Sequence, residues 1–232
     1  MPEDVQPPPV PGSSPSDLLA AVRGLSAWFW GLALIVLVLA GVLTVRLPFL
    51  ARLPGHSVGL LILLVGVYHV HQAWPTHAPC RRWVRLLGLA VTLQLYLVPF
   101  LGWWRSGTAA WYALANLILL LASGLIMLAG LARWVEAMAG HLGETELRIE
   151  ARLSGWVIPA LGGLSFALYA VRGGRLAWYT DPAFALHHLL VETDPFLLFP
   201  ALLPFIPALA IAWTAKTRLL HTLARISGSR PV

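Results

Sequence analysis

Residues 26–45 read SAWFWGLALIVLVLAGVLTV, and this stretch contains no charged side chain. A membrane-crossing helix needs roughly 20 predominantly apolar residues, so this stretch is long enough to cross a bilayer. Similar runs recur along the 232-residue chain, of which 58% is hydrophobic and only 11% charged, against about 25% charged in a soluble domain. A transmembrane β-barrel would alternate in polarity over about ten residues, whereas these runs are continuously apolar. The sequence therefore predicts an all-α, polytopic helical bundle in a membrane.

About six membrane-spanning helices are expected, at residues 26–45, 57–74, 86–104, 109–132, 154–171 and 195–215. Together they form one transmembrane domain over residues 17–220. Residues 1–16 are polar and rich in proline, which predicts a disordered tail, and residues 221–232 form a second tail. Ser16 or Asp17 is expected to cap a short helix that leads into the first span.

The basic residues are distributed unequally between the two sides of the predicted bundle. Eleven of them fall in one set of alternate loops and tails: Arg23, Arg81, Arg82, Arg85, Arg133, Arg148, Arg152, Lys216, Arg218, Arg225 and Arg230. The other set holds five: Arg46, Arg52, Arg105, Arg172 and Arg175. Because cytoplasmic loops carry the excess of lysine and arginine, both termini are predicted to be cytoplasmic in the cell inner membrane. The basic residues are expected to meet membrane lipid rather than nucleic acid.

Two of the predicted loops are long enough to contain structure. The inner loop at residues 134–153 is expected to hold a short helix continuous with the fifth span. Within it, Glu144 and Arg148 have the favourable order and spacing for an ion pair on one helix. The outer loop at residues 172–194 is expected to hold an amphipathic helix at the membrane surface.

The stretch YHVHQAWPTHAPCRRW at residues 68–83 concentrates three histidines and the chain's single cysteine. His69 and His71 would project about 200° apart on a helix, so they do not share a metal ion. The spacing of His71, His77 and Cys80 fits no common zinc motif. We interpret the positions of His71, His77 and Cys80 as a short loop at the membrane surface, and we assign no metal site and no catalytic residue. His69, the deepest of these histidines, is the better functional candidate because polar groups in lipid face protein.

Haem b is the cofactor that the histidines would suit, although no cofactor is otherwise predicted. His56 and His71 are fifteen residues apart and about 60° apart around one helix, but a second pair of that kind is missing. A single haem held between His56 and His187 or His188 is the remaining arrangement. The candidate haem-binding residues are therefore His56, His69, His187 and His188.

The sixth span carries Pro200, Pro204 and Pro207 on one helix face. Each proline removes a backbone donor, and bare carbonyls at membrane depth are tolerated only against protein or a water-filled cavity. The segment is therefore expected to be kinked or unwound. Either packing accommodates the kink, or the face lines a cavity together with Gln94 and Asn116. Those two side chains are alternatively expected to form hydrogen bonds between helices.

The fifth span contains Gly163 and Ala167, a pair of small residues that suits close contact between membrane helices. Together with the lack of a catalytic motif, this favours a non-catalytic subunit or assembly partner of a larger membrane complex, with other membrane subunits as partners. The first alternative is a membrane anchor subunit of a respiratory enzyme that binds haem b or quinone. The second is a transporter subunit with a cavity at the proline-rich sixth span.

Overall fold

The computed structural model describes residues 14–44, 55–74, 76–105, 111–177 and 195–228. In these residues the structure is helical, without strands. The elements are α1 (Pro15–Thr44), α3 (Gly55–Ala73), α4 (Ala78–Arg105), α5 (Trp111–Leu142), α6 (Thr145–Ala177), the 3-10 helix η1 (Pro195–Leu202) and α8 (Phe205–Gly228).

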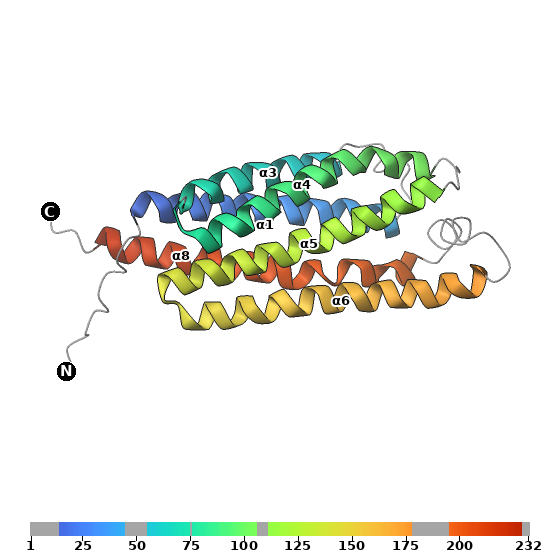
Figure 1. The fold of residues 1–232 in the computed structure, drawn as a ribbon. Helices are drawn as coiled ribbons and strands as arrows, with labels where there is room; N and C mark the ends of the chain where they lie inside the picture. Colours follow the sequence, from blue (N-terminus) through green and yellow to red (C-terminus); the bar gives the residue numbers. More distant parts are fainter. Residues whose placement is uncertain (1–13, 45–54, 75, 106–110, 178–194, 229–232) are drawn as a thin grey trace.

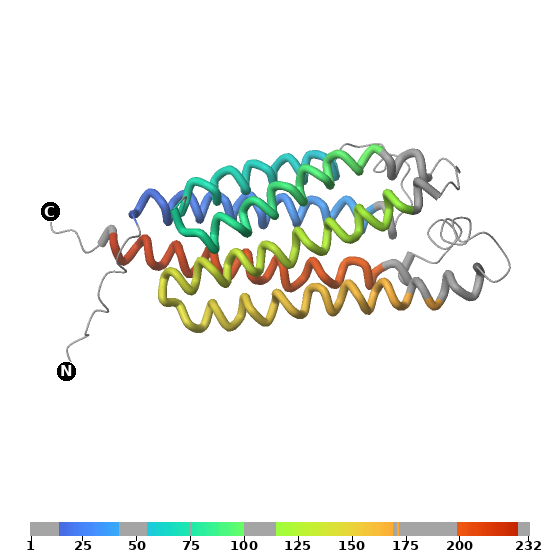
Figure 2. Tube along the Cα trace, viewed as in Figure 1, coloured from blue at the N-terminus to red at the C-terminus, as the bar shows by residue number. Residues whose placement is uncertain are grey.

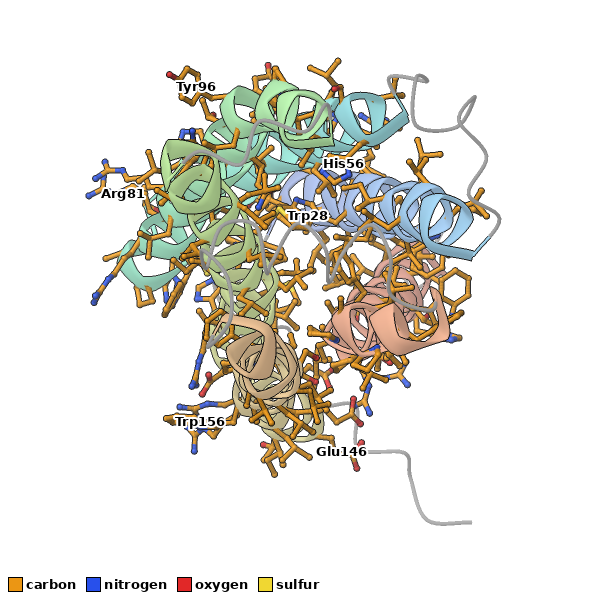
Figure 3. All side chains as sticks on the ribbon, turned by 90° about the vertical axis from the view of Figure 1, so that its right-hand side faces the viewer. Trp28, His56, Arg81, Tyr96, Glu146 and Trp156 are labelled. Atoms are coloured by element: carbon orange, nitrogen blue, oxygen red, sulfur yellow. The ribbon has the colours of Figure 1, made fainter. Side chains whose placement is uncertain are left out.

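The helices form an up-and-down bundle in which each packs against the next along the chain, and α8 closes the ring against α1 (Figures 1 and 3). The start of α1 and the end of α8 lie at the same end of the bundle (Figure 1). That end also holds the starts of α4 and α6 and the ends of α3 and α5, and we call it the arginine-rich end. It gathers the described members of the basic set that the sequence assigned to one side, and Arg230 lies outside the described residues.

In the part of the chain that the structure describes, five helical segments are long and apolar enough to cross a membrane: α1, α3, α5, α6 and the segment Phe199–Ile226, which contains the end of η1 and most of α8. The predicted all-α membrane bundle is therefore confirmed. The helix α4 runs between α3 and α5 over the same length of the bundle (Figure 1).

The helices α5 and α6 are much longer than the spans predicted for them. They contain 32 and 33 residues, or about 48 and 50 Å at 1.5 Å per residue, against a hydrocarbon core of about 30 Å. The prediction of an inner loop at residues 134–153 is wrong in its first half, because α5 continues to Leu142. Its second half is correct, since α6 begins at Thr145 and runs without interruption into the fifth span. The two helices thus form a hairpin longer than the hydrocarbon core is thick, and its turn lies at the arginine-rich end (Figure 2).

The turn of this hairpin depends on Gly143, whose φ angle is 72°. The amide of Glu144 donates to the carbonyl of Ala139 at 2.9 Å, which is the backbone bond of a Schellman helix end. A residue with a side chain is disfavoured at this φ, so Gly143 fixes where α5 ends and how tightly α6 returns.

Helical structure extends beyond the predicted spans at both ends of the described chain. The helix cap is Ser14, not Ser16 or Asp17. The Oγ atom of Ser14 accepts from the amide of Asp17 at 3.2 Å, and the carboxylate of Asp17 accepts from the amide of Ser14 at 3.2 Å. Pro15 takes the first helical position, where a missing N–H costs nothing. Residues 1–13 of the predicted disordered tail lie outside the described residues. The last two residues of that predicted tail, 15 and 16, already belong to α1. At the other end α8 continues to Gly228, so the first part of the predicted C-terminal tail is helical.

The helices α1 and α3 approach each other most closely, through glycines seven residues apart on each. A Cβ built on Gly24 would lie 3.0 Å from the carbonyl oxygen of Gly66, and one on Gly31 would lie 3.0 Å from that of Gly59. Each member of a pair thus meets the backbone of the other. Membrane helices approach this closely only where both present small residues, so the two pairs fix the register of α1 against α3.

The proline-rich segment is unwound, as expected. Residues Pro195–Leu202 form the 3-10 helix η1, and α8 starts only at Phe205. The carbonyl of Pro200, which Pro204 leaves without its helical donor, accepts the Ser165 hydroxyl at 2.6 Å and the Leu203 amide at 3.2 Å. At Pro200, therefore, the neighbouring helix α6 satisfies the freed carbonyl.

Replacing Ser165 by alanine removes the hydroxyl that reaches η1 from α6. We expect Ser165→Ala to lower the free energy of unfolding by about 1 kcal/mol, because Pro200 keeps only its bond from Leu203. Equilibrium unfolding in mixed detergent micelles measures this change. Thr217→Ala is the matched control, since that hydroxyl bonds only to Trp213 within α8. An equal loss in both variants would contradict the role assigned to Ser165.

Candidate functional site

A polar pocket opens at the arginine-rich end, between α4, α5 and α6. Its volume is about 600 Å³, which is within the usual range of small-molecule sites. The lining residues come from the turn before α4, from α4 itself, from α5 and from α6: His77, Pro79, Trp83, Arg133, Glu136, Ala137, Gly140, His141 and Arg148. Two arginines, two histidines and one carboxylate therefore face a single space.

One wall of the pocket is the seam between α5 and α6, where each arginine rests on a glycine of the other helix. A Cβ on Gly155 of α6 would lie 3.0 Å from Nε of Arg133, which comes from α5. Conversely, a Cβ on Gly140 of α5 would lie 3.6 Å from Nε of Arg148, which comes from α6. The glycines leave the space that these two guanidinium groups occupy, so the antiparallel register of the hairpin sets their positions.

Glu136 holds the centre of the seam with two ion pairs. Its carboxylate oxygens accept from Arg133 Nη1 and from Arg152 Nε, each at 2.8 Å. Arg133 also lies over the ring of Trp156, 5.0 Å from its centroid, which adds a cation–π contact. Arg133 and Arg152 are thereby held in place. Together with the carboxylate of Glu136 they carry a net positive charge.

The sequence-based pairing of Glu144 with Arg148 is wrong. Arg218 of α8 takes Glu144, with 3.9 Å between Nη1 and the carboxylate, together with Glu146 at 3.1 Å and Glu150 at 3.3 Å. This cluster ties α8 to the start of α6. Among the residues that the structure describes, Arg148 has no carboxylate partner, so its full charge is presented to the pocket.

His77 and Cys80 meet at the opposite wall. The Nδ1 atom of His77 lies 3.1 Å from Sγ of Cys80, and its ring centroid is 4.6 Å from that of His141. Burial, and secondly the nearby His141, lower the pKa of His77, so its ring is neutral at pH 7. Burial raises the pKa of the Cys80 thiol to about 12. The pair is thus an imidazole with a neutral thiol, without the thiolate that nucleophilic or metal-binding cysteines require.

Cys80 offers a direct test of this geometry because it is the chain's single cysteine and is only 2% exposed. We expect maleimide to leave the folded protein unlabelled at pH 7.5 and to label it fully after denaturation, since both burial and the raised pKa suppress the reactive thiolate. Intact-mass spectrometry follows the reaction. Rapid labelling of the folded protein would show that the thiol is accessible or ionised, contrary to this arrangement.

The structure separates the histidines that the sequence singled out. His71 is exposed on α3. The histidine that lies beside His77 is His141 of α5, and not His71. His69 is half-buried beside Tyr68, with ring centroids 5.6 Å apart. In the described part of the chain, no three His, Cys, Asp or Glu side chains are arranged to hold a metal ion.

Of the other candidate haem ligands, one lies at the far end of the bundle and two lie outside the described residues. His56 is in the first turn of α3, at the opposite end of the bundle (Figure 3). Its Nε2 atom is buried and has no hydrogen-bond partner among the described residues. His187 and His188 both lie outside the described residues, so their place relative to His56 stays a prediction.

Gln94 forms the hydrogen bonds between helices that were expected of it. From α4, its Nε2 donates to the carbonyl of Leu120 at 2.6 Å and to Oγ of Ser123 at 3.0 Å, both on α5. Asn116 is half-buried on α5, and the structure describes no bond for its side chain. That Gln94, Asn116 and the three prolines line a transport cavity stays a prediction.

The outer surface of α6 carries the small residues noted in the sequence. Gly163 and Ala167 are both exposed, whereas Gly162, one position away, packs against Leu125 of α5. A Cβ on Gly163 would meet no atom within 4 Å, unlike those on the other described glycines within helices. The pair therefore lies on the outside of the bundle, available to another molecule.

Sequence reasoning missed most of the pocket, namely Arg133, Glu136, His141 and Arg148. A usable signal was present, because Arg133, Glu136 and Gly140 recur at helical spacing on α5, but the residues were assigned to a loop. The chain matches no protein-family model, and neither a curated protein nor a solved structure matches it.

Proposed function

We propose that this chain is a non-catalytic, multi-pass subunit or assembly partner of a larger complex in the cell inner membrane. The observation that supports the proposal is the outward position of Gly163. Between α1 and α3, and between α5 and α6, this chain uses glycine to bring helices together. In lipid, close helix contact is driven mainly by such small-residue packing.

On α6 the same kind of surface is exposed at Gly163 and Ala167, and none of the helices that the structure describes covers it. Glycine in a helix interior costs about 0.5–1 kcal/mol relative to alanine, a cost that close approach of another backbone offsets. A transmembrane helix of another subunit, packed against Gly163, supplies such an approach. The excess of arginine at one end supports the inner membrane, with that end in the cytoplasm.

The test is the mass of the native assembly in membranes of the cells that encode the chain. Gly163→Leu is expected to shift the chain from a high-mass species to its monomer mass on a native gel, while its purified monomer unfolds as the wild type does. Ala210→Leu is the matched control, since Ala210 is also small and exposed, on α8. A wild-type chain that runs only as a monomer, or equal behaviour of the two variants, would refute the proposal.

A second candidate function, a subunit that binds haem b, is favoured by one observation: the buried, unpartnered Nε2 of His56. Such an atom lacks the hydrogen bond that buried polar groups normally make, and an axial bond to iron would satisfy it. The absorption spectrum of the purified protein decides this question. A Soret band that shifts on dithionite reduction and is lost in His56→Ala would support haem, and a protein without the band would exclude it.

A further inference from the structure

The pocket at the arginine-rich end has a surplus of positive charge that the ion pairs within it do not cancel. Glu136 is shared by Arg133 and Arg152, and Arg148 brings a further charge with no carboxylate partner in the described residues. Each guanidinium has five donors. Arg133 uses its Nη1 on Glu136, and in the described residues the guanidinium group of Arg148 has no ion-pair partner. The ligand that complements this pocket is an anion rich in acceptors.

The arginines flank the pocket at a spacing that suits a headgroup. Arg148 lies against Gly140 of α5. Gly140 is two helical turns, or about 10 Å, along α5 from Arg133, so the two arginines lie at opposite ends of the pocket wall. Guanidinium groups bind phosphate oxygens with charge-assisted, often bidentate hydrogen bonds. The half-buried ring of Trp83 and the neutral His77 provide further polar contacts from α4 and the turn before it.

Below the pocket, α5 carries an exposed apolar face in line with Arg133. Along α5, the residues at helical spacing on the side of Arg133 are Ile126, Ala122 and Leu119, and all three are exposed. Ile126 and Leu119 are 55% and 44% exposed. An anion that enters the pocket from the membrane can therefore lay a hydrocarbon chain along α5, whereas a free ion in water would gain nothing from this surface.

We infer that the pocket between α4, α5 and α6 binds an anionic phospholipid, with its phosphate between Arg133 and Arg148 and an acyl chain along the exposed face of α5. Basic pockets between membrane helices recognise headgroups in this way. This inference is independent of the partner surface on α6. Arg133 and Arg148 lie at the seam between α5 and α6, whereas Gly163 lies on the outer side of α6. Arg148 is the decisive residue, since within the described residues it takes part in no ion pair that its loss would break.

The experiment measures the melting temperature of the full chain in a neutral detergent with added dioctanoyl phosphatidylglycerol, dioctanoyl phosphatidylcholine or inorganic phosphate. Phosphatidylglycerol well above its Kd is expected to raise the Tm by about 5 °C or more, and phosphatidylcholine is not. Arg148→Gln is expected to weaken the phosphatidylglycerol effect about tenfold in concentration. Arg225→Gln is the matched control, because it removes the same charge from an exposed position at the same end of the bundle.

Each alternative outcome overturns part or all of the inference. An equal rise in Tm with inorganic phosphate would show that the pocket binds free phosphate, and the proposal of a lipid ligand would be wrong. Equal shifts with the two lipids would show that the headgroup charge is not recognised. Equal behaviour of Arg148→Gln and Arg225→Gln would show that binding follows net charge and does not use this pocket.

Discussion

Replacing Gly66 by alanine is expected to lower the free energy of unfolding by about 1–3 kcal/mol through overpacking. The new methyl group would lie 2.8 Å from Nε1 of Trp28 and 3.1 Å from the carbonyl oxygen of Gly24. Trp28 is fully buried and has no free space to enter, and the carbonyl belongs to the backbone of α1. The better helix propensity of alanine, about 1 kcal/mol, offsets only part of the cost. Gly66→Leu, which adds three more carbons, is expected to force α1 and α3 apart and prevent folding.

Gly163→Ala is the control for Gly66→Ala, since its methyl group meets no atom within 4 Å. It is expected to leave the purified chain as stable as the wild type, or slightly more stable. Both variants are measured by equilibrium unfolding in mixed micelles with circular dichroism. If Gly66→Ala were as stable as Gly163→Ala, the close contact between α1 and α3 would be wrong.

Removing the charge of Glu136 is the second change with a large expected effect. Its side chain is 16% exposed and accepts from two arginines. Glu136→Gln leaves Arg133, itself only 23% exposed, without a counter-charge at the seam of α5 and α6. Since hydrogen bonds to charged groups contribute about 1.5–3 kcal/mol each, we expect a loss of about 2 kcal/mol in the free energy of unfolding.

Glu146→Gln provides the comparison for Glu136→Gln, because Glu146 also pairs with an arginine but its side chain is 80% exposed. Exposed ion pairs contribute little, so this variant is expected to change the free energy of unfolding by less than about 0.5 kcal/mol. Thermal unfolding of the two variants under one set of conditions gives the comparison. A larger loss for Glu146→Gln than for Glu136→Gln would reverse the order that burial predicts.

The helices themselves were largely predictable, and their ends were not. Each apolar run identified a helix because length and polarity are properties of a single segment. Polar residues beyond a run carry no such signal, and for this reason residues 134–142 were taken for a loop although they extend α5. There the end of the helix is decided by Gly143, whose positive φ and backbone bond from Glu144 to Ala139 are visible only in the structure.

The candidate pocket was less predictable, because it depends on a choice between partners that are distant in sequence. From the sequence, Glu144 has Arg148 four residues away and the two appear paired. In the structure Arg218 comes in from α8 and takes Glu144, Glu146 and Glu150, which leaves Arg148 to face the pocket. No local pattern around Arg148 contains that information.

The sequence by itself determined that this protein is a bundle of membrane helices with its arginines concentrated on one side. It could do so because the bilayer acts on each segment separately, through its thickness and its low polarity. Only the tertiary structure decided which glycines meet, as Gly24 meets Gly66, and which charges pair, as Glu136 pairs with Arg152. Those contacts depend on the register between two helices, and register is a property of the pair that neither sequence segment carries alone.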